Sequence, residues 1–227
     1  MSTAIATAQL MRVARFYEST IGRKAIMAVT GLLLFGFLIA HMLGNLQIFL
    51  GPTVMNHYAE TLHGSPGLLW TARTILLLAV VLHIWVSVQL AMLKKQARPI
   101  GYVKYKPIHS SWASRSMMLS GSIIGAFVVF HLLHLTTGTI HPQFIPLHAY
   151  ENLVNGFLVI PFALAYIAAM VFIGFHLSHG AWSMFQSVGF SHPRYTPVIR
   201  KGAAVAAWIL VGGFISVPLA VITGLVR

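Results

Sequence analysis

The chain has 227 residues, of which 57% are hydrophobic and only 8% charged, and 15 Lys and Arg against 3 Asp and Glu give a formal net charge of +12. Because a soluble domain carries about a quarter charged residues, this composition excludes a water-soluble globular protein. Cysteine is absent, which excludes disulfides, thiolate metal sites, iron–sulfur ligation and a cysteine nucleophile. The acids are Glu18, Glu60 and Glu151 alone, so paired-carboxylate chemistry is excluded too.

The segment from Leu10 to Lys24 places arginines among apolar residues, a pattern typical of a short helix at the membrane interface. The apolar stretch behind it is long and lacks a small-x-small cleavage site. We therefore expect this segment to be retained.

Five apolar stretches are long enough to cross a bilayer, which takes roughly 20 residues per helix. They cover residues 25–49, 68–93, 117–137, 153–188 and 203–226. The sequence thus predicts an all-α integral membrane protein, a five-helix bundle forming one transmembrane domain over residues 1–227. The fourth stretch is longer than a span requires, and we expect it to tilt or to project beyond the bilayer. No internal repeat is evident.

Basic residues gather on one side of the predicted spans. They precede the first span, separate the second from the third and separate the fourth from the fifth: Arg12, Arg15, Arg23 and Lys24; Lys94, Lys95, Arg98, Lys104, Lys106 and Arg115; Arg194, Arg200 and Lys201. The opposite loops, 50–67 and 138–152, contain no Lys or Arg. By the positive-inside rule we expect a multi-pass protein of the cell membrane with its N-terminus cytoplasmic and its C-terminus outside, and we interpret the charge as orientation, not nucleic-acid binding.

Six of the twelve histidines lie inside the predicted spans: His41, His83, His131, His134, His176 and His179. A polar ring in the hydrocarbon region needs a partner, and an intramembrane ionisable residue is by default a functional candidate. Taken singly, each is better explained as a hydrogen-bonded core histidine. The set of six favours a cofactor site.

Two of these histidines are expected at one depth. His41 lies about 17 residues into an outward-running span, or roughly 25 Å across a core of about 30 Å. His131 follows Gly121 by ten residues, as His41 follows Gly31, and its span also runs outward. The pair is therefore expected in the outer leaflet. Glycines along these spans would leave room for a porphyrin face or for a neighbouring helix.

The other pair is expected in the inner leaflet, because His83 and His176 come late in inward-running spans. Two pairs at two depths, with one histidine on each of four helices, suit two stacked haems, each bound on both faces by neutral imidazole. Such irons have no open position, which favours electron transfer over oxygen chemistry. Helix rise predicts a layer separation of about 15 Å.

His134 and His179 each follow a candidate ligand by three residues, on nearly the same helix face. Depth favours His131 over His134 as the partner of His41, whereas spacing leaves His176 and His179 open. The spare histidines are expected to hydrogen-bond a haem propionate, a quinone or a neighbouring helix.

At these residues the chain resembles the cytochrome b membrane subunit of succinate:quinone oxidoreductases and fumarate reductases, in its five-helix, two-haem form. The matching segments are TGLLLFGFLIAHMLGN, LLLAVVLHIWVSVQLAM, SSWASRSMMLSGSIIGAFVVFHLLHL and FIGFHLSHGAWSMFQSVGF. The resemblance extends over nearly the whole chain. Its most specific element is the ordered set of four histidines on four of five helices.

The resemblance implies that His41 and His131 ligate the iron of an outer haem b, and His83 and His176 that of an inner haem b. It selects His176 over His179, because the family ligand precedes a glycine by four residues, as His176 precedes Gly180. It also implies a flavoprotein that oxidises succinate and an iron–sulfur subunit on the cytoplasmic face. Electrons would pass from these to a membrane quinone, with menaquinone implied, and this chain would carry out no dicarboxylate chemistry itself. Whether the complex oxidises succinate or reduces fumarate is left open.

One position departs from some members of that family. They carry a glutamate, associated with a proton path, two residues before the fourth ligand, where this chain has Gly174. The quinone site is poorly defined by sequence, because quinone pockets are apolar with few polar anchors. The outer-side candidates are Glu60, Arg73 and His134. Their structural alternatives are a solvated acid, an interfacial anchor and a helix contact.

Two other functions compete with this interpretation. A proton-coupled transporter could use the histidines as a relay, but it would usually place acids in its spans and break its helices near the midplane. Here the predicted spans hold no Asp or Glu, and Pro161 and Pro218 are weak breaks. A di-haem cytochrome b serving a hydrogenase or formate dehydrogenase has the same physical features and is separated from the first interpretation only by family resemblance.

Overall fold

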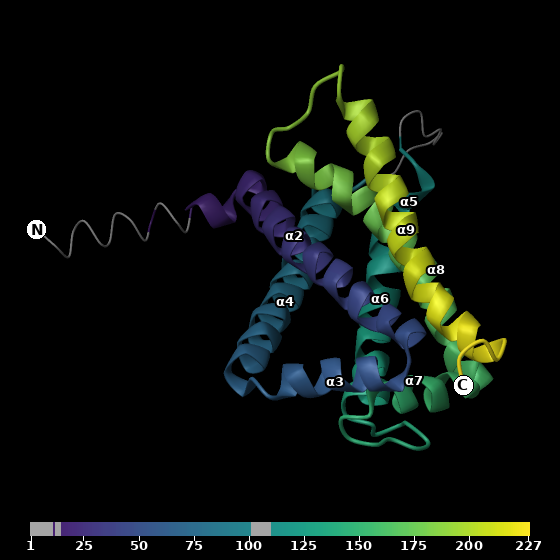
Figure 1. The fold of residues 1–227 in the computed structure, drawn as a ribbon. Coiled ribbons are helices and arrows are strands. Elements are labelled where there is room, and N and C mark those ends of the chain that lie inside the picture. The colour runs from purple at the N-terminus through teal and green to yellow at the C-terminus, as the bar shows by residue number, and fades with distance from the viewer. Residues whose placement is uncertain (1–10, 12–14, 101–109) are drawn as a thin grey trace, which may run out of the picture.

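The computed structural model describes residue 11 and residues 15–100 and 110–227 (Figure 1). Over these residues the chain forms helices and no strand, which confirms the all-α prediction. Of the predicted interfacial helix, Leu10 and Arg12 lie outside the described residues, and so do Lys104 and Lys106 of the second basic segment. Residues 15–18 are helical.

Five helices are long and apolar enough to span a membrane, as predicted. They are α2 (Thr20–Asn45) with its 3-10 continuation η1 (Leu46–Leu50), α4 (Pro66–Gln96), α6 (Met117–His131) with the π-helical turn η2 (Leu132–Thr136), α8 (Ile160–Ser187) and α9 (Thr196–Ile222). The shorter helices are α3 (Pro52–His63), α5 (Trp112–Arg115) and α7 (Ala149–Leu158). The fold is therefore that of a multi-pass membrane protein.

Local sequence accounts for several helix starts. Ser19 caps α2 by accepting a hydrogen bond from the Gly22 N–H at 2.9 Å. Proline lies in the first turn of α3, α4, α8 and α9, where the N–H that it lacks has no intrahelical partner in any case. Gly51 takes a φ of 94° between η1 and α3, a conformation that other residues adopt only with strain.

The fourth apolar stretch, 153–188, is two helices and not the single continuous span that the sequence predicts. The helical hydrogen bonding stops at Leu158, and Val159 takes an extended ψ of 93° before α8 begins. Pro161 explains the break, because its ring would clash with the carbonyl of Phe157 and it has no N–H to donate. Hence α7 turns aside across the end of the bundle and α8 alone crosses it (Figure 1).

The long helices alternate in direction (Figure 1). As a result, most of the described basic residues lie at one end of the bundle and two acidic residues lie at the other. One end holds the start of α2, the end of α4, α5, and the α8–α9 connection. We call it the basic end, because Arg23, Lys94, Arg115, Arg194 and Arg200 lie there. The opposite end holds α3, α7 and the end of α9, with Glu60 and Glu151.

At the opposite end, α3 and α7 lie across the helix ends and are joined by polar contacts (Figure 1). The side chain of Asn56 donates to a Glu151 carboxylate oxygen at 2.8 Å and accepts from the Tyr150 N–H at 2.9 Å. The Tyr150 hydroxyl donates to the Arg227 carbonyl at 2.9 Å. Most of the expected loop 50–67 is thus the helix α3, which packs on α7.

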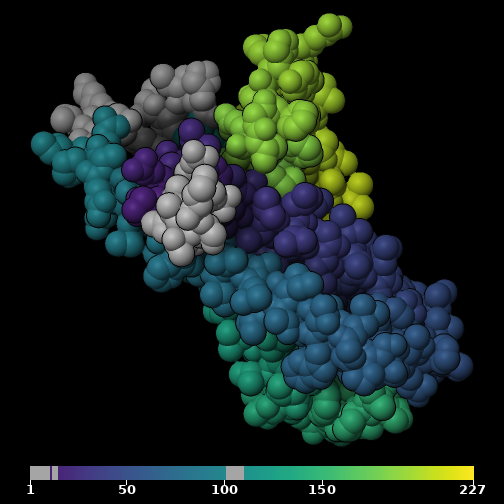
Figure 2. Space-filling view, turned by 90° about the vertical axis from the view of Figure 1, so that its left-hand side faces the viewer, coloured from purple at the N-terminus to yellow at the C-terminus, as the bar shows by residue number. Residues whose placement is uncertain are grey.

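The core lies where α8 packs on α9 and on the end of α7, around residues such as Phe157, Tyr166, Val211 and Val221. Helix α2 packs against α4, α8 and α9, and α6 packs against α8. In the view of Figure 2, α4 runs across the outside of the molecule beside α2, with α3 at one end. Within the described residues, α2 is the long helix against which α4 packs most closely.

The absence of native cysteine allows a direct test of this topology. Single Ser65→Cys and Ser191→Cys variants place a thiol in exposed loops at the opposite end and at the basic end. We expect a membrane-impermeant maleimide to label them from opposite sides of the membrane, since an odd number of spans separates them. Leu77→Cys, on the exposed apolar surface of α4, is the control and should resist labelling from both sides. Labelling of both loop cysteines from one side would contradict the five-span fold.

Candidate functional site

Two histidines meet in the half of the bundle nearer the basic end. His83 of α4 and His176 of α8 have ring centroids 6.5 Å apart, with ring planes at 60°. Their helices are not among the closely packed pairs, so the side chains approach each other across a gap between the backbones. The expected pairing of these two residues is therefore seen in the geometry. We call them the basic-end pair.

Each ring of the basic-end pair is held by a hydroxyl on the helix packed beside it. Thr30 Oγ1 of α2 lies 3.0 Å from His83 Nδ1, and Ser120 Oγ of α6 lies 3.2 Å from His176 Nδ1. Gly31 and Gly121 follow these hydroxyl residues. A Cβ on either glycine would lie 3.4 to 3.5 Å from the Cε1 of the same histidine.

The other two predicted ligands meet toward the opposite end. His41 of α2 and His131 of α6 have ring centroids 5.7 Å apart, with ring planes at 82°. His131 Nδ1 lies 3.2 Å from the Tyr166 hydroxyl of α8. His41 stacks on Phe37 with a centroid distance of 5.2 Å. We call His41 and His131 the opposite-end pair.

The contacts with Thr30 and Ser120 also measure the separation of the two layers. His83 lies at the level of Thr30, and His41 follows Thr30 by 11 residues on the same helix. His176 lies at the level of Ser120, which His131 likewise follows by 11 residues. At 1.5 Å per residue, both helices place the layers about 16 Å apart along the helix axis.

His134 does not face His41. The π-helical turn η2 carries it inward, where it is fully buried with Nδ1 3.0 Å from the Tyr166 hydroxyl. Its ring stacks on His141 with a centroid distance of 5.0 Å, and its Nε2 has no hydrogen-bond partner. Gly156 of α7 allows this packing, because a Cβ there would lie within 3.0 Å of both rings. The geometry agrees with His131, not His134, as the partner of His41.

His179 is likewise turned away from the basic-end pair. Its ring packs against Trp182 with a centroid distance of 5.6 Å, and the guanidinium of Arg200 lies 5.3 Å from the centroid of the same tryptophan. The ring that faces His83 is that of His176. Of the two residues that spacing left open, His176 is therefore the one whose ring faces His83.

The donor set suits a haem iron better than a bare metal ion. In the described part of the chain, no three His, Cys, Asp or Glu side chains gather as metal ligands. A haem iron needs only two protein nitrogens. Two axial bonds of about 2 Å each, with about 1 Å from each nitrogen to its ring centre, require ring centroids roughly 6 Å apart. The observed 6.5 and 5.7 Å bracket that distance.

Space beside the pairs is consistent with a flat cofactor. Added Cβ atoms on Gly36 of α2 and Gly125 of α6 would meet nothing within 4 Å. The helices that carry facing rings, α2 with α6 and α4 with α8, do not pack closely against each other. The ring separations within both pairs are therefore compatible with two protein ligands to one iron.

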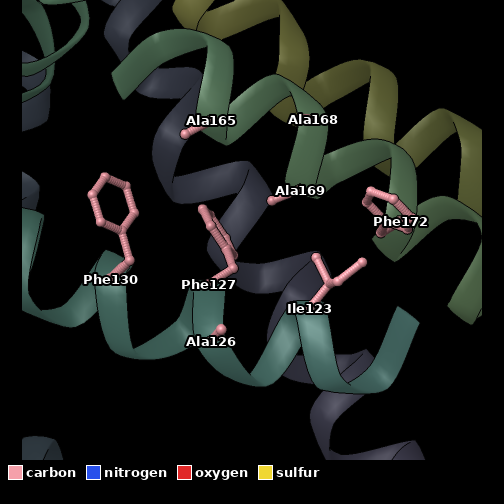
Figure 3. Close-up of a pocket in the computed structure, with 8 residues that line it drawn as sticks. All are labelled: Ile123, Ala126, Phe127, Phe130, Ala165, Ala168, Ala169 and Phe172. Carbon is pink, nitrogen blue, oxygen red and sulfur yellow. The ribbon is translucent and has the colours of Figure 1, made fainter. Parts of the chain in front are cut away.

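An apolar groove between α6 and α8 adjoins the opposite-end pair (Figure 3). Its volume is about 280 Å³, and Ile123, Phe127, Phe130 and Ala169 lie among its lining residues. The ring of Phe127 also contacts His131 and Tyr166, at centroid distances of 5.9 and 5.0 Å. One aromatic ring therefore separates this groove from the histidine layer.

The three quinone-site candidates are not brought together. Glu60 lies on the exposed side of α3, 4.0 Å from His57 Nδ1. The guanidinium of Arg73 lies over Trp70 at 5.1 Å on α4, and His134 is buried between α6 and α8. Among the described residues, no hydrogen bond, ion pair or ring contact joins any two of the three. A cleft of about 410 Å³ beside α3, lined by Gln47, His57, Tyr58 and Thr61, was not anticipated.

Thr30, Ser120 and Tyr166 are the contact residues that sequence reasoning missed. The sequence held a signal for two of them. Thr30 and Gly31 precede His41 by the same numbers of residues as Ser120 and Gly121 precede His131. Nothing comparable marks Tyr166, whose position depends on how α8 packs after the break at Val159.

Comparison with protein-family models gives no match, and searches of curated proteins and of solved structures give none either. The assignment of function therefore depends on the residues and their geometry.

Tyr166 provides a test of the polar contacts. Tyr166→Phe removes the hydroxyl that two imidazole nitrogens share, and leaving buried polar atoms unpaired costs about 1 to 3 kcal/mol. We expect thermal unfolding of the purified protein to occur at a lower temperature. Tyr195→Phe, on an exposed loop, is the matched control and should change the free energy of unfolding by less than about 0.5 kcal/mol. Equal stability of the two variants would contradict the contact.

Proposed function

We propose that this chain is the membrane anchor and electron-transfer subunit of a succinate:quinone oxidoreductase, in which it holds two haems b. The observation that carries the proposal is the meeting of four histidines, from four helices, as two facing pairs in two layers. Single core histidines need no such pairing. The family assignment is supported by the sequence resemblance and by this agreement between expected and observed partners.

When bound, two haems would supply one-electron carriers at two depths of the membrane. The chain's own contribution is to hold and orient them. His83 and His176 would be the axial ligands nearer the basic end, and His41 and His131 those nearer the opposite end. If each pair supplied two nitrogens to its iron, neither site would leave a coordination position for substrate.

The basic end is proposed to face the cytoplasm, by the positive-inside rule. This orientation puts the N-terminus inside and the C-terminus outside. The iron–sulfur subunit, with the flavoprotein behind it, would dock on the basic end, because electrons must enter near the His83 and His176 layer. In the labelling experiment described above, Ser191→Cys should then be reached only after the cells are permeabilised.

The quinone, with menaquinone expected from the resemblance, is proposed to react at the opposite end. A second pair of ligands about 16 Å beyond the first contributes to electron transfer chiefly if the quinone accepts electrons near that second pair. The cleft beside α3 offers polar side chains for a quinone ring, and the adjacent Glu60 and His57 could exchange protons with the outside. The cleft shares α3 with Glu60, which favours Glu60 over Arg73 and His134 as a quinone-site residue.

The two alternatives are separated by measurement. A di-haem cytochrome of a hydrogenase or formate dehydrogenase would have the same spectrum but would purify with different partner subunits. A histidine-relay transporter would bind no haem, and the transmembrane helices α2, α4, α6, α8 and α9 contain no Asp or Glu for such a relay.

The ligand pairs are tested by haem content and spectra. Pyridine haemochrome assay should return about two haems per chain, as two axial pairs require. His41→Ala and His131→Ala should remove one spectral component, and His83→Ala and His176→Ala the other. His134→Ala and His179→Ala are the controls and should retain both. A haem content near zero, or loss of one component in both His41 and His83 variants, would contradict the proposal.

Energy coupling gives a second test. Gly174, where some relatives carry a proton-path glutamate, is buried against Trp208, and even a Cβ there would lie 2.8 Å from the indole. With no acid at this position, electron flow across the membrane should be uncompensated by protons and therefore coupled to the membrane potential. We expect an uncoupler to change the rate of succinate:quinone reaction in energised vesicles. A rate that is independent of the potential would contradict a quinone site at the opposite end.

A further inference from the structure

Each hydroxyl beside the basic-end pair already donates its proton to a backbone carbonyl of its own helix. Thr30 Oγ1 lies 2.8 Å from the Ile26 carbonyl oxygen of its own helix, and Ser120 Oγ lies 3.0 Å from the Ser116 carbonyl oxygen. A carbonyl only accepts, so each hydroxyl must donate to it. The single hydroxyl proton is then unavailable to the histidine.

It follows that the histidines donate. The hydroxyl oxygen can only accept from His83 Nδ1 at 3.0 Å, and the same holds for Ser120 and His176 at 3.2 Å. Nδ1 therefore carries the proton in both neutral rings. Nε2 then has its lone pair free, which is the form required for binding a metal through Nε2.

The same arrangement occurs twice, on two helix pairs. In α2 with α4 and in α6 with α8, the first helix offers a back-bonded hydroxyl followed by a glycine, and the second offers the histidine. Two separate packings thus give the same tautomer on the two rings that face each other. A chance contact with one hydroxyl would not produce this match.

The opposite-end pair is held differently. There the Tyr166 hydroxyl lies between His131 Nδ1 and His134 Nδ1, at 3.2 and 3.0 Å. Its proton has a histidine nitrogen, not a backbone carbonyl, as its partner. A device that fixes the tautomer through a backbone-saturated hydroxyl is therefore specific to the basic-end pair.

We propose that Thr30 and Ser120 are positioning residues that fix the Nε2-ligating tautomer of His83 and His176 and lower the reduction potential of the haem bound between them. This inference rests on the proposed function, because it concerns that haem. A hydrogen bond from Nδ1–H increases the electron donation of the imidazole to the iron, which stabilises the oxidised metal. Loss of the hydroxyl acceptor should raise the potential, most clearly at His176, because His83 also has a backbone contact with Met27.

The test is a potentiometric titration of the purified membrane complex, followed by visible spectra. Thr30→Val and Ser120→Ala should each raise the midpoint potential of the component that His83→Ala removes, and leave the other component in place. The double variant should shift that component further. Thr30→Ser, which keeps the hydroxyl, should titrate as the wild type does.

Two matched controls carry the same back-bonded hydroxyl away from any histidine. Thr74 of α4 donates to the Trp70 carbonyl at 2.8 Å, and Ser122 of α6 donates to the Met118 carbonyl at 2.9 Å. Thr74→Val and Ser122→Ala should leave both potentials unchanged. Equal shifts in these controls would show a general effect of helix repacking and would overturn the inference.

The remaining outcomes separate the inference from the proposed function. Two haems in the wild type with unshifted potentials in Thr30→Val and Ser120→Ala, or a shift confined to the other component, would overturn the inference alone. A wild type without haem would overturn both. If Thr30→Val does not accumulate in the membrane, the Ser120→Ala titration decides, because each hydroxyl acts on the same component.

Discussion

An imidazole inside the hydrocarbon region has two nitrogens, and each needs a hydrogen-bond partner or a ligand because no water is available there. The packing of the bundle can be understood from this requirement. α2 must bring Thr30 to His83, and α6 must bring Ser120 to His176, so these helices lie side by side in pairs. The rings of His83 and His176 approach each other where α4 and α8 do not pack closely. That is where a flat ligand would complete the coordination.

Hydropathy was enough to predict the number of long apolar helices. Hydropathy and helix rise together matched His41 with His131 and His83 with His176, because depth depends on spacing along a single helix. They could not predict the rotation of each helix about its own axis, which determines the direction in which its side chains point. The choice of His176 over His179 depends on rotation, and it became visible only when α8 was packed against its neighbours.

Interruptions of helices were the other limit of the sequence. The stretch 153–188 is mostly apolar, and the sequence suggested only a weak break at Pro161, yet this proline stops the helical hydrogen bonding and α7 turns across the bundle end. The same turn brings Gly156 against His134 and His141. The expected loop 50–67 is likewise mostly a helix. Its contacts with α7 through Asn56 join residues about 95 positions apart, which spacing along one helix could not reveal.

The division of each facing pair between two hairpins affects biogenesis. The hairpin of α2 and α4 supplies His41 and His83, and the hairpin of α6 and α8 supplies His131 and His176, so neither hairpin holds a complete pair. During synthesis, the His41 layer is completed when α6 inserts, and the His83 layer only when α8 follows. Any ligand held by a facing pair would therefore connect the two hairpins only after both have been inserted, in addition to the direct packing of α2 on α8.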